Sequence, residues 1–283
     1  MVNYTIGWFS TGRGPGSRNL LKFVMDAIAV GQIQARVSYV FCSRGEGEAE
    51  GSDLYIRMVR DYGLNLVTCS SRAFKPAMRK QGKQNPEVMN QWRLEYDREV
   101  MARLTPFSAH IIVLAGYMLI VGEEMCHTYD LINLHPAAPN GPAGTWQEVI
   151  WKLMEERASE SGVMMHLVTP ELDKGPRLTY CMFPIRDTAT NPLWDDYERA
   201  LKENNGLEMI IRKEGEKNPL FKEIRRRGVM REIPLIVQTL KILSEGIIVI
   251  KDKKVMADNK LCHEPYCLTE AIEASIKSAP PPA

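Results

Sequence analysis

The stretch Asp-Leu-Ile-Asn-Leu-His-Pro at residues 130–136 decides the fold. Ile132 and Leu134 alternate with Asn133 and His135, which is the period-two pattern of a short strand. The proline that follows has no N–H and cannot extend a central ladder, so we expect the strand to end there. The pattern therefore sets an amide and an imidazole side by side at the carboxyl end of a strand, where ligands bind in open α/β sheets.

A second stretch supplies a carboxylate. Residues 162–168 (GVMMHLV) have the composition of a strand, and residues 169–176 (TPELDKGP) form a turn closed by a Gly-Pro pair. Asp173 lies in that turn, where a carboxylate close to His135 would fix the imidazole tautomer, raise its pKa and orient a water molecule. We expect His166, on the strand itself, to have a structural role.

An Asn, a His and an Asp together suit acyl transfer to an amine. A tetrahedral intermediate needs a hydrogen-bond donor for its oxyanion, which Asn133 supplies, and a group that moves a proton from the attacking nitrogen, which His135 supplies. No Ser or Cys stands beside His135 in a nucleophile motif, so the pattern favours direct transfer over a covalent acyl-enzyme. Each residue alone is also typical of a structural turn or strand end.

The segments LINLHPAAP (131–139) and MMHLVTPELDKGP (164–176) resemble the folate-dependent formyltransferase family. This resemblance implies transfer of a formyl group from 10-formyltetrahydrofolate, with Asn133, His135 and Asp173 as the catalytic residues. Within the family, the similarity is greatest to members that formylate glycinamide ribonucleotide, a phosphorylated amine of purine biosynthesis. Other acceptors remain open: a sugar nucleotide, methionyl-tRNA, or water in a formyltetrahydrofolate deformylase.

The amino-terminal segment predicts a phosphate site. A strand at residues 4–10, a glycine-rich loop and a helical run form the opening of a doubly wound sheet, and Ser17 is a candidate helix cap. The resemblance implies that Gly16, Ser17 and Asn19 bind the substrate phosphate, while a purely structural turn is the alternative reading of the glycines. A dinucleotide-dependent oxidoreductase is disfavoured, because residues 42–44 (Cys-Ser-Arg) stand where an acidic residue is expected.

A buried parallel strand is expected at residues 110–117 (HIIVLAGY). The resemblance implies that the apolar residues after this strand, together with one residue of the Asp173 turn, line the folate pocket. These residues are Met118, Leu119, Ile120, Val121 and Leu172. Apolar core is the alternative interpretation.

The order of predicted elements indicates an α/β fold with a Rossmann-like, mostly parallel twisted sheet flanked by helices and a carboxyl-terminal helix and β-hairpin extension. We divide the chain into a catalytic domain at 1–186, an extension of the same domain at 187–277 and a disordered tail at 278–283. Residues 70–85 are expected to form a loop. The basic cluster at residues 225–227 is assigned to a solvated helix face, with phosphate binding as the alternative.

Composition narrows the class of protein. The net charge of +1 argues against nucleic acid as a partner, and no run reaches the roughly 18 apolar residues of a membrane span. The 6 cysteines lack a Cys-x-x-Cys pair, so we expect free thiols, no metal site and a cytoplasmic protein. A non-enzymatic module that binds folate or a nucleotide is the alternative from a different class, and the oligomeric state is not predicted.

Overall fold

The computed structural model describes residues 4–203 and 206–278. Its internal contacts divide the chain into two compact units. The first unit comprises residues 1–133, 166–176 and 240–262, and the second comprises residues 134–165, 177–239 and 263–283. The tail predicted at 278–283 lies outside the described residues, except for Ser278, which ends the last helix.

The first unit is built on a parallel sheet. Its strands are β1 (Tyr4–Ser10), β2 (Ala35–Cys42), β3 (Leu66–Thr68), β4 (Ile111–Leu114) and the first residues of β5 (Leu131–His135). The order β4-β1-β2-β3 is parallel throughout, and β5 pairs in parallel with the free side of β4. The apolar runs of β1, β2 and β4 are buried over most of their length, as expected for strands covered on both faces.

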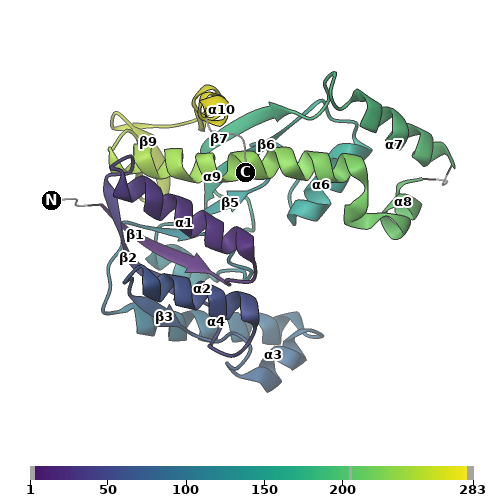
Figure 1. Cartoon of the computed structure of the whole chain (residues 1–283). Helices are drawn as coiled ribbons and strands as arrows, with labels where there is room; N and C mark the ends of the chain where they lie inside the picture. Colours follow the sequence, from purple (N-terminus) through teal and green to yellow (C-terminus); the bar gives the residue numbers. More distant parts are fainter. Residues whose placement is uncertain (1–3, 204–205, 279–283) are drawn as a thin grey trace. The chain divides into compact units, whose positions relative to one another are not determined.

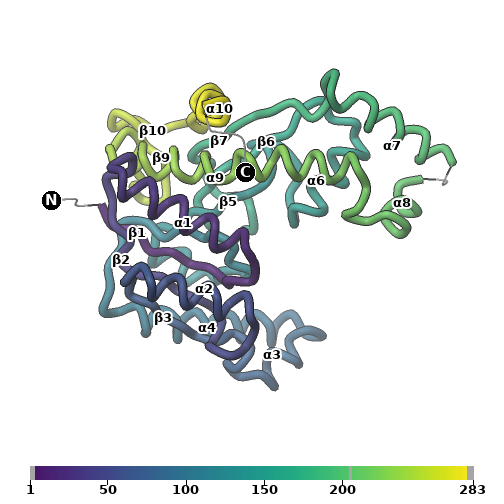
Figure 2. The backbone as a smooth tube through the Cα atoms, viewed as in Figure 1, coloured from purple at the N-terminus to yellow at the C-terminus, as the bar shows by residue number. Residues whose placement is uncertain are grey.

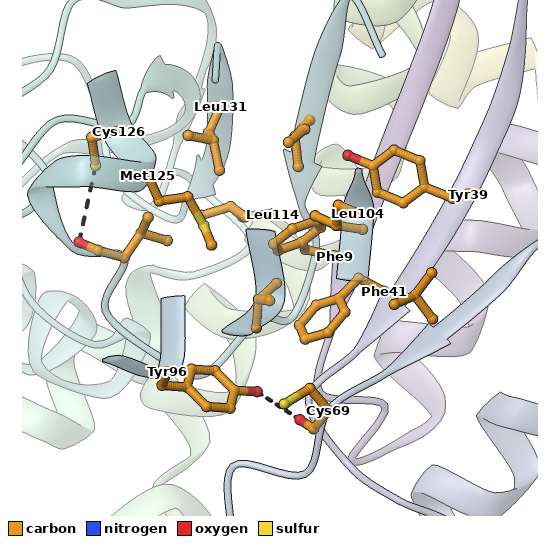
Figure 3. Close-up of a cluster of buried hydrophobic side chains, with 14 of the residues drawn as sticks. Phe9, Tyr39, Phe41, Cys69, Tyr96, Leu104, Leu114, Met125, Cys126 and Leu131 are labelled. Atoms are coloured by element: carbon orange, nitrogen blue, oxygen red, sulfur yellow. Dashed lines mark hydrogen bonds between the residues drawn. The ribbon is translucent and has the colours of Figure 1, made fainter. Parts of the chain in front are cut away.

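Helices cover both faces of this sheet. They are α1 (Pro15–Ala29), α2 (Glu50–Asp61), α3 (Pro76–Gly82), α4 (Pro86–Leu104) and α5 (Glu123–Thr128). In Figure 1, α1 and α2 lie next to each other over one face. On the other face, aromatic side chains of α4 pack against Phe9 and Phe41 of the sheet, and Figure 3 shows this cluster. Within it, the Tyr96 hydroxyl donates to the backbone carbonyl of Cys69 at 2.7 Å.

The second unit contains these strands and helices: α6 (Trp146–Glu155), most of β6 (Glu160–Leu167), β7 (Arg177–Pro184), α7 (Asn191–Glu203), α8 (Leu207–Lys213), the 3-10 turn η1 (Gly215–Lys217), most of α9 (Pro219–Ser244), β11 (Tyr266–Cys267) and α10 (Thr269–Ser278). Its strand order is β11-β7-β6, with β11 parallel to β7. Figure 2 traces α8 beside α7 in this unit. Trp194 and Tyr197 of α7 and Phe221 of α9 are buried in its core.

The predicted α/β fold is confirmed, with a mostly parallel sheet flanked by helices. The β-hairpin expected in the carboxyl-terminal extension is also present, as β8 (Val249–Lys251) and β9 (Lys254–Ala257), extended by β10 (Lys260–Leu261). Asp252 and Lys253 both have positive φ, which matches the right-handed twist of a two-residue hairpin turn.

The loop expected at residues 70–85 is wrong in part, because α3 forms inside it. Pro76 stands in the first turn, where a missing N–H costs nothing. Gly82, near the end of the helix, lies so close to the next helix that a Cβ on it would be 2.9 Å from the Met89 Cα. Packing against α4 therefore stabilises a helix that the polar sequence of this segment does not predict.

Candidate active site

Asn133 is presented by the last paired position of β5 in the first unit. It lies opposite Leu114 of β4 and is half-buried, whereas the preceding Ile132 is fully buried. Its side chain therefore emerges at the carboxyl edge of a parallel sheet, as the strand pattern predicts.

His166 contacts Asn133 directly. The Asn133 Nδ2 and the His166 Nε2 are 3.3 Å apart, and the His166 Nδ1 is 2.9 Å from the carbonyl oxygen of Leu167. A carbonyl can only accept, so Nδ1 carries the proton and Nε2 of the neutral ring accepts from the amide. An amide NH₂ group has two donor hydrogens, so Asn133 keeps a second one for another acceptor.

Asp173 reaches the same imidazole from the loop after β6. Its Oδ1 lies 3.6 Å from the His166 Nε2, and both side chains are largely buried, with 11% and 3% exposed. The backbone of Asp173 is left-handed, with φ of 57°. Gly175 holds this loop against β6, because a Cβ on it would lie 1.8 Å from the Leu167 carbonyl oxygen. The Leu167 N–H in turn donates to the carbonyl of Pro176 at 2.8 Å.

These polar groups meet a small apolar cavity of about 110 Å³ in the first unit. Its lining includes Asn133, His166 and Asp173. Four of the predicted folate residues contribute to its apolar part together with Leu114, Tyr117 and Val168; they are Leu119, Ile120, Val121 and Leu172. The fifth, Met118, is 60% exposed and is not part of this lining; its N–H donates to the Thr11 Oγ1 at 2.9 Å. An apolar wall beside three convergent polar side chains is typical of a ligand site.

A larger groove of about 570 Å³ borders the same segment. Ile120 and Val121 line both spaces, and the groove is otherwise bounded mainly by polar residues of α4, among them Arg93 and Asn90. The segment at 119–122 therefore separates a small, partly polar cavity from a broad groove with a cationic side chain.

His135 ends β5 and belongs to the second unit. It is 3% exposed, and its Nε2 lies 3.3 Å from the carbonyl oxygen of Pro142. Because that oxygen can only accept, His135 donates the hydrogen on Nε2 to it.

The predicted phosphate residues lie in the first turns of α1. The expected Ser17 cap is wrong: Gly14 occupies the N-cap position, so Gly16, Ser17 and Asn19 are inside the helix. A Cβ on Gly16 would meet nothing within 4 Å, so a ligand can approach the backbone there. The Arg18 guanidinium donates to the Gly51 carbonyl at 3.3 Å and is thus engaged within the unit.

The basic cluster of α9 is paired with acidic side chains of the second unit. Arg227 contacts Asp187 at 2.6 Å and Glu223 at 2.8 Å, while Arg225 pairs with Glu232. The hydrogen bond from Arg227 lowers the pKa of Asp187 to about 2. This ion-pair network replaces the predicted solvated helix face with a structural role for Arg225 and Arg227.

His166 is the site residue that the sequence interpretation missed. Its strand pattern indicates only a buried position, and the structure shows that it joins Asn133 to Asp173. The alternation of residues along the strand at 162–168 places His166 on the same face as Met164. That pattern alone does not show that His166 has a polar partner. Across the described residues, no group of three or more His, Cys, Asp or Glu side chains is arranged to hold a metal. No helix in residues 4–203 and 206–278 is long and apolar enough to span a membrane.

Known proteins resemble this chain in sequence and in fold. The sequence model of the formyl transferase family matches residues 18–212. Phosphoribosylglycinamide formyltransferase of Escherichia coli (strain K12) is 25% identical over 173 residues, covering 60% of this chain and 70% of the relative. The enzyme of that name from Dictyostelium discoideum is 32% identical over 142 residues, covering 46% and 67% respectively. The crystal structure of phosphoribosylglycinamide formyltransferase from Coxiella burnetii superposes with a TM-score of 0.63 at 17% identity, over 93% of this chain and 98% of that one.

Proposed function

This chain belongs to the formyl transferase family, and we propose that it transfers a formyl group from 10-formyltetrahydrofolate to the amino group of glycinamide ribonucleotide in purine biosynthesis. The acceptor is proposed from the two curated relatives, both named phosphoribosylglycinamide formyltransferase.

One observation carries the catalytic part of the proposal. Asn133 and Asp173 come from segments 40 positions apart in the sequence, yet both contact His166 and both line the cavity that Leu119, Val121 and Leu172 close on its apolar side. Binding alone does not require an amide and a carboxylate to converge on one imidazole, whereas in the proposed acyl transfer Asn133 and Asp173 act at the reacting atoms and His166 positions them.

The proposed reaction is a direct transfer. The acceptor nitrogen attacks the formyl carbon, and the bond from that carbon to N10 of the folate then breaks. The second N–H of Asn133 donates to the oxyanion of the tetrahedral intermediate. His135 takes a proton from the attacking nitrogen, and Asp173 orients the water that relays this proton from His135 to N10. The products are tetrahydrofolate and the formylated amine.

The two neighbouring spaces suit the two ends of the folate. The cavity of about 110 Å³ is smaller than the roughly 300 Å³ or more that a drug-sized ligand fills, so it takes only the pterin. The groove of about 570 Å³ takes the benzoyl-glutamate portion; Arg93 can pair with one of its carboxylates, whereas Glu87 and Glu123 in the same lining disfavour a second one. Gly16, Ser17 and Asn19 are the proposed contacts of the acceptor's phosphate, because the first turn of α1 offers N–H donors to an anion.

A reducing cytoplasm is the compartment we propose. The six cysteines of the chain all lie in the described ranges, and all are free thiols. Four of them are buried inside the fold, which is usual for proteins that keep their thiols reduced.

The test follows the absorbance of 10-formyltetrahydrofolate with and without glycinamide ribonucleotide. Consumption that requires the ribonucleotide is the expected result. Consumption without it would replace the proposal with a hydrolase, and no consumption with either would remove this acceptor. His135→Ala should lower turnover roughly 10²-fold, whereas His127→Ala, at an exposed position of α5, should leave it unchanged.

A further inference from the structure

Asp97 is a buried carboxylate that the proposed chemistry does not use. It stands in the middle of α4 and is only 2% exposed. Its Oδ2 accepts the backbone N–H of Gly122 at 2.6 Å. A Cβ on Gly122 would lie 2.9 Å from the same oxygen, so the carboxylate packs closely against the backbone at that position.

Gly122 ends the segment that lines the candidate folate pocket. The beginning of this segment is fixed by the buried Thr11, whose Oγ1 accepts the Met118 N–H at 2.9 Å. The residues between these two hydrogen bonds contact both the cavity and the groove through Ile120 and Val121. One side chain from the β1–α1 loop and one from α4 therefore hold the two ends of the segment.

We propose that Asp97 is a positioning residue for the folate donor, which keeps the segment at 118–122 in the conformation that forms one wall of the pocket. The ligand's identity rests on the proposed function, whereas the hydrogen bond to Gly122 does not. Without an acceptor at position 97, the Gly122 N–H would be left unsatisfied next to α4, and the segment would shift toward solvent to find one.

The protonation of Asp97 should affect this hydrogen bond near neutral pH. Burial raises the pKa of Asp97 to about 7; the Gly122 N–H and Arg93 act in the lowering direction, and Glu124 acts in the raising direction. Three further titratable groups interact electrostatically with Asp97: Tyr96, Tyr117 and Cys126. Burial raises the pKa of each of them, so they stay neutral around pH 7. A carboxylate accepts a hydrogen bond more strongly than a neutral carboxyl group, so the segment is held more firmly above pH 7 than below it.

Two substitutions separate positioning from general structure. Asp97→Ala removes the acceptor and should raise the KM for 10-formyltetrahydrofolate about tenfold, with kcat within about threefold of wild type. Asp97→Asn keeps a carbonyl oxygen for Gly122 and should restore a KM close to wild type, without the inflection near pH 7 that the wild-type KM shows. Glu99→Gln changes a carboxylate of α4 that pairs with Arg103 at the surface, and it should leave KM and its pH profile unaltered.

A readout that needs no activity is the amide signal of Gly122. Val–Gly pairs occur only at 30–31 and 121–122, so labelling valine with carbonyl ¹³C and glycine with ¹⁵N leaves two signals to assign. The Gly122 signal should titrate with a midpoint near pH 7 in the wild type and stay constant in Asp97→Asn. The Gly31 signal provides the internal control.

The two proposals fail in distinguishable ways. A wild-type protein that transfers no formyl group but shows the Gly122 titration would overturn the proposed function and keep the contact that positions the segment. An Asp97→Ala variant that is folded and has an unchanged KM would overturn the positioning role, as would a Gly122 signal that does not respond to pH in the wild type.

Discussion

Asp173 offers the sharpest test of the proposed mechanism, because its backbone limits which substitution is informative. Its φ of 57° lies in the left-handed region, which Asn adopts readily and Ala does not. Asp173→Ala therefore removes the carboxylate and strains the backbone at once, at a cost of about 1–2 kcal/mol in folding free energy. Asp173→Asn removes only the charge.

The magnitudes follow from the contacts. The Asp173 Oδ1 is 3.6 Å from the His166 Nε2, beyond hydrogen-bond distance, so loss of this contact in the Asn variant should cost less than about 1 kcal/mol of folding free energy. If Asp173 orients the water that relays the proton, the same variant should lose roughly 10²-fold in kcat, equivalent to about 2.7 kcal/mol of transition-state stabilisation. Catalysis and stability should therefore separate in Asp173→Asn and fall together in Asp173→Ala.

The assay pairs urea unfolding with steady-state turnover of 10-formyltetrahydrofolate. Asp258 is the matched control: it is exposed in the turn between β9 and β10 and has a φ of 49°. Asp258→Ala should show the backbone cost without the loss of kcat. The reasoning is refuted if Asp173→Asn retains kcat within about threefold of wild type while its folding free energy is unchanged.

Substitutions at three further positions test other parts of the structure. His166→Ala should lower kcat about tenfold, because Asn133 loses the hydrogen-bond acceptor that positions it. His166→Gln has an amide oxygen that can accept from Asn133, so it should recover part of that loss. Equal losses in both variants would contradict the positioning of Asn133 by His166. Arg227→Gln should lower the urea midpoint at neutral pH. The pKa of Asp187 is lowered to about 2, so its pair with Arg227 stabilises the fold above about pH 4 and loses that contribution between about pH 4 and 2. The urea midpoints of variant and wild type should therefore converge at the acid end of this window. Thr145→Ala should cost about 1 kcal/mol by removing the capping box of α6, measured by urea unfolding; no change in midpoint would show that the cap is not needed.

The basic cluster of α9 shows where charge patterning misleads. From the sequence, residues 225–227 are three neighbouring cations, and a solvated face is the natural interpretation. In the second unit, Asp187 reaches Arg227 from the end of β7, 40 positions earlier in the chain. Such a partner has no local signal, because it depends on how β7 and α9 pack.

The sequence by itself determined the main strands and the edge of the sheet at which the candidate site lies. Alternating residues at 131–135 and the apolar runs at 4–10 and 110–117 are local patterns, and they predict parallel strands whose carboxyl ends carry polar groups; the last of these strands is shorter in the structure, at Ile111–Leu114. The Gly-Pro pair likewise predicted the turn that contains Asp173, because glycine and proline restrict the backbone locally.

Only the tertiary structure decided which side chains meet. The link between Asn133 and Asp173 through His166 requires β5, β6 and the following loop to come together, and the Asp97 contact with Gly122 requires α4 to pack against the segment after β4. Hydrogen bonds between residues 25 or more positions apart leave no periodicity in the sequence, since each partner alone satisfies only its own local pattern. The sequence therefore predicted the edge of the sheet at which the candidate site lies, and tertiary packing decided which side chains contact one another there.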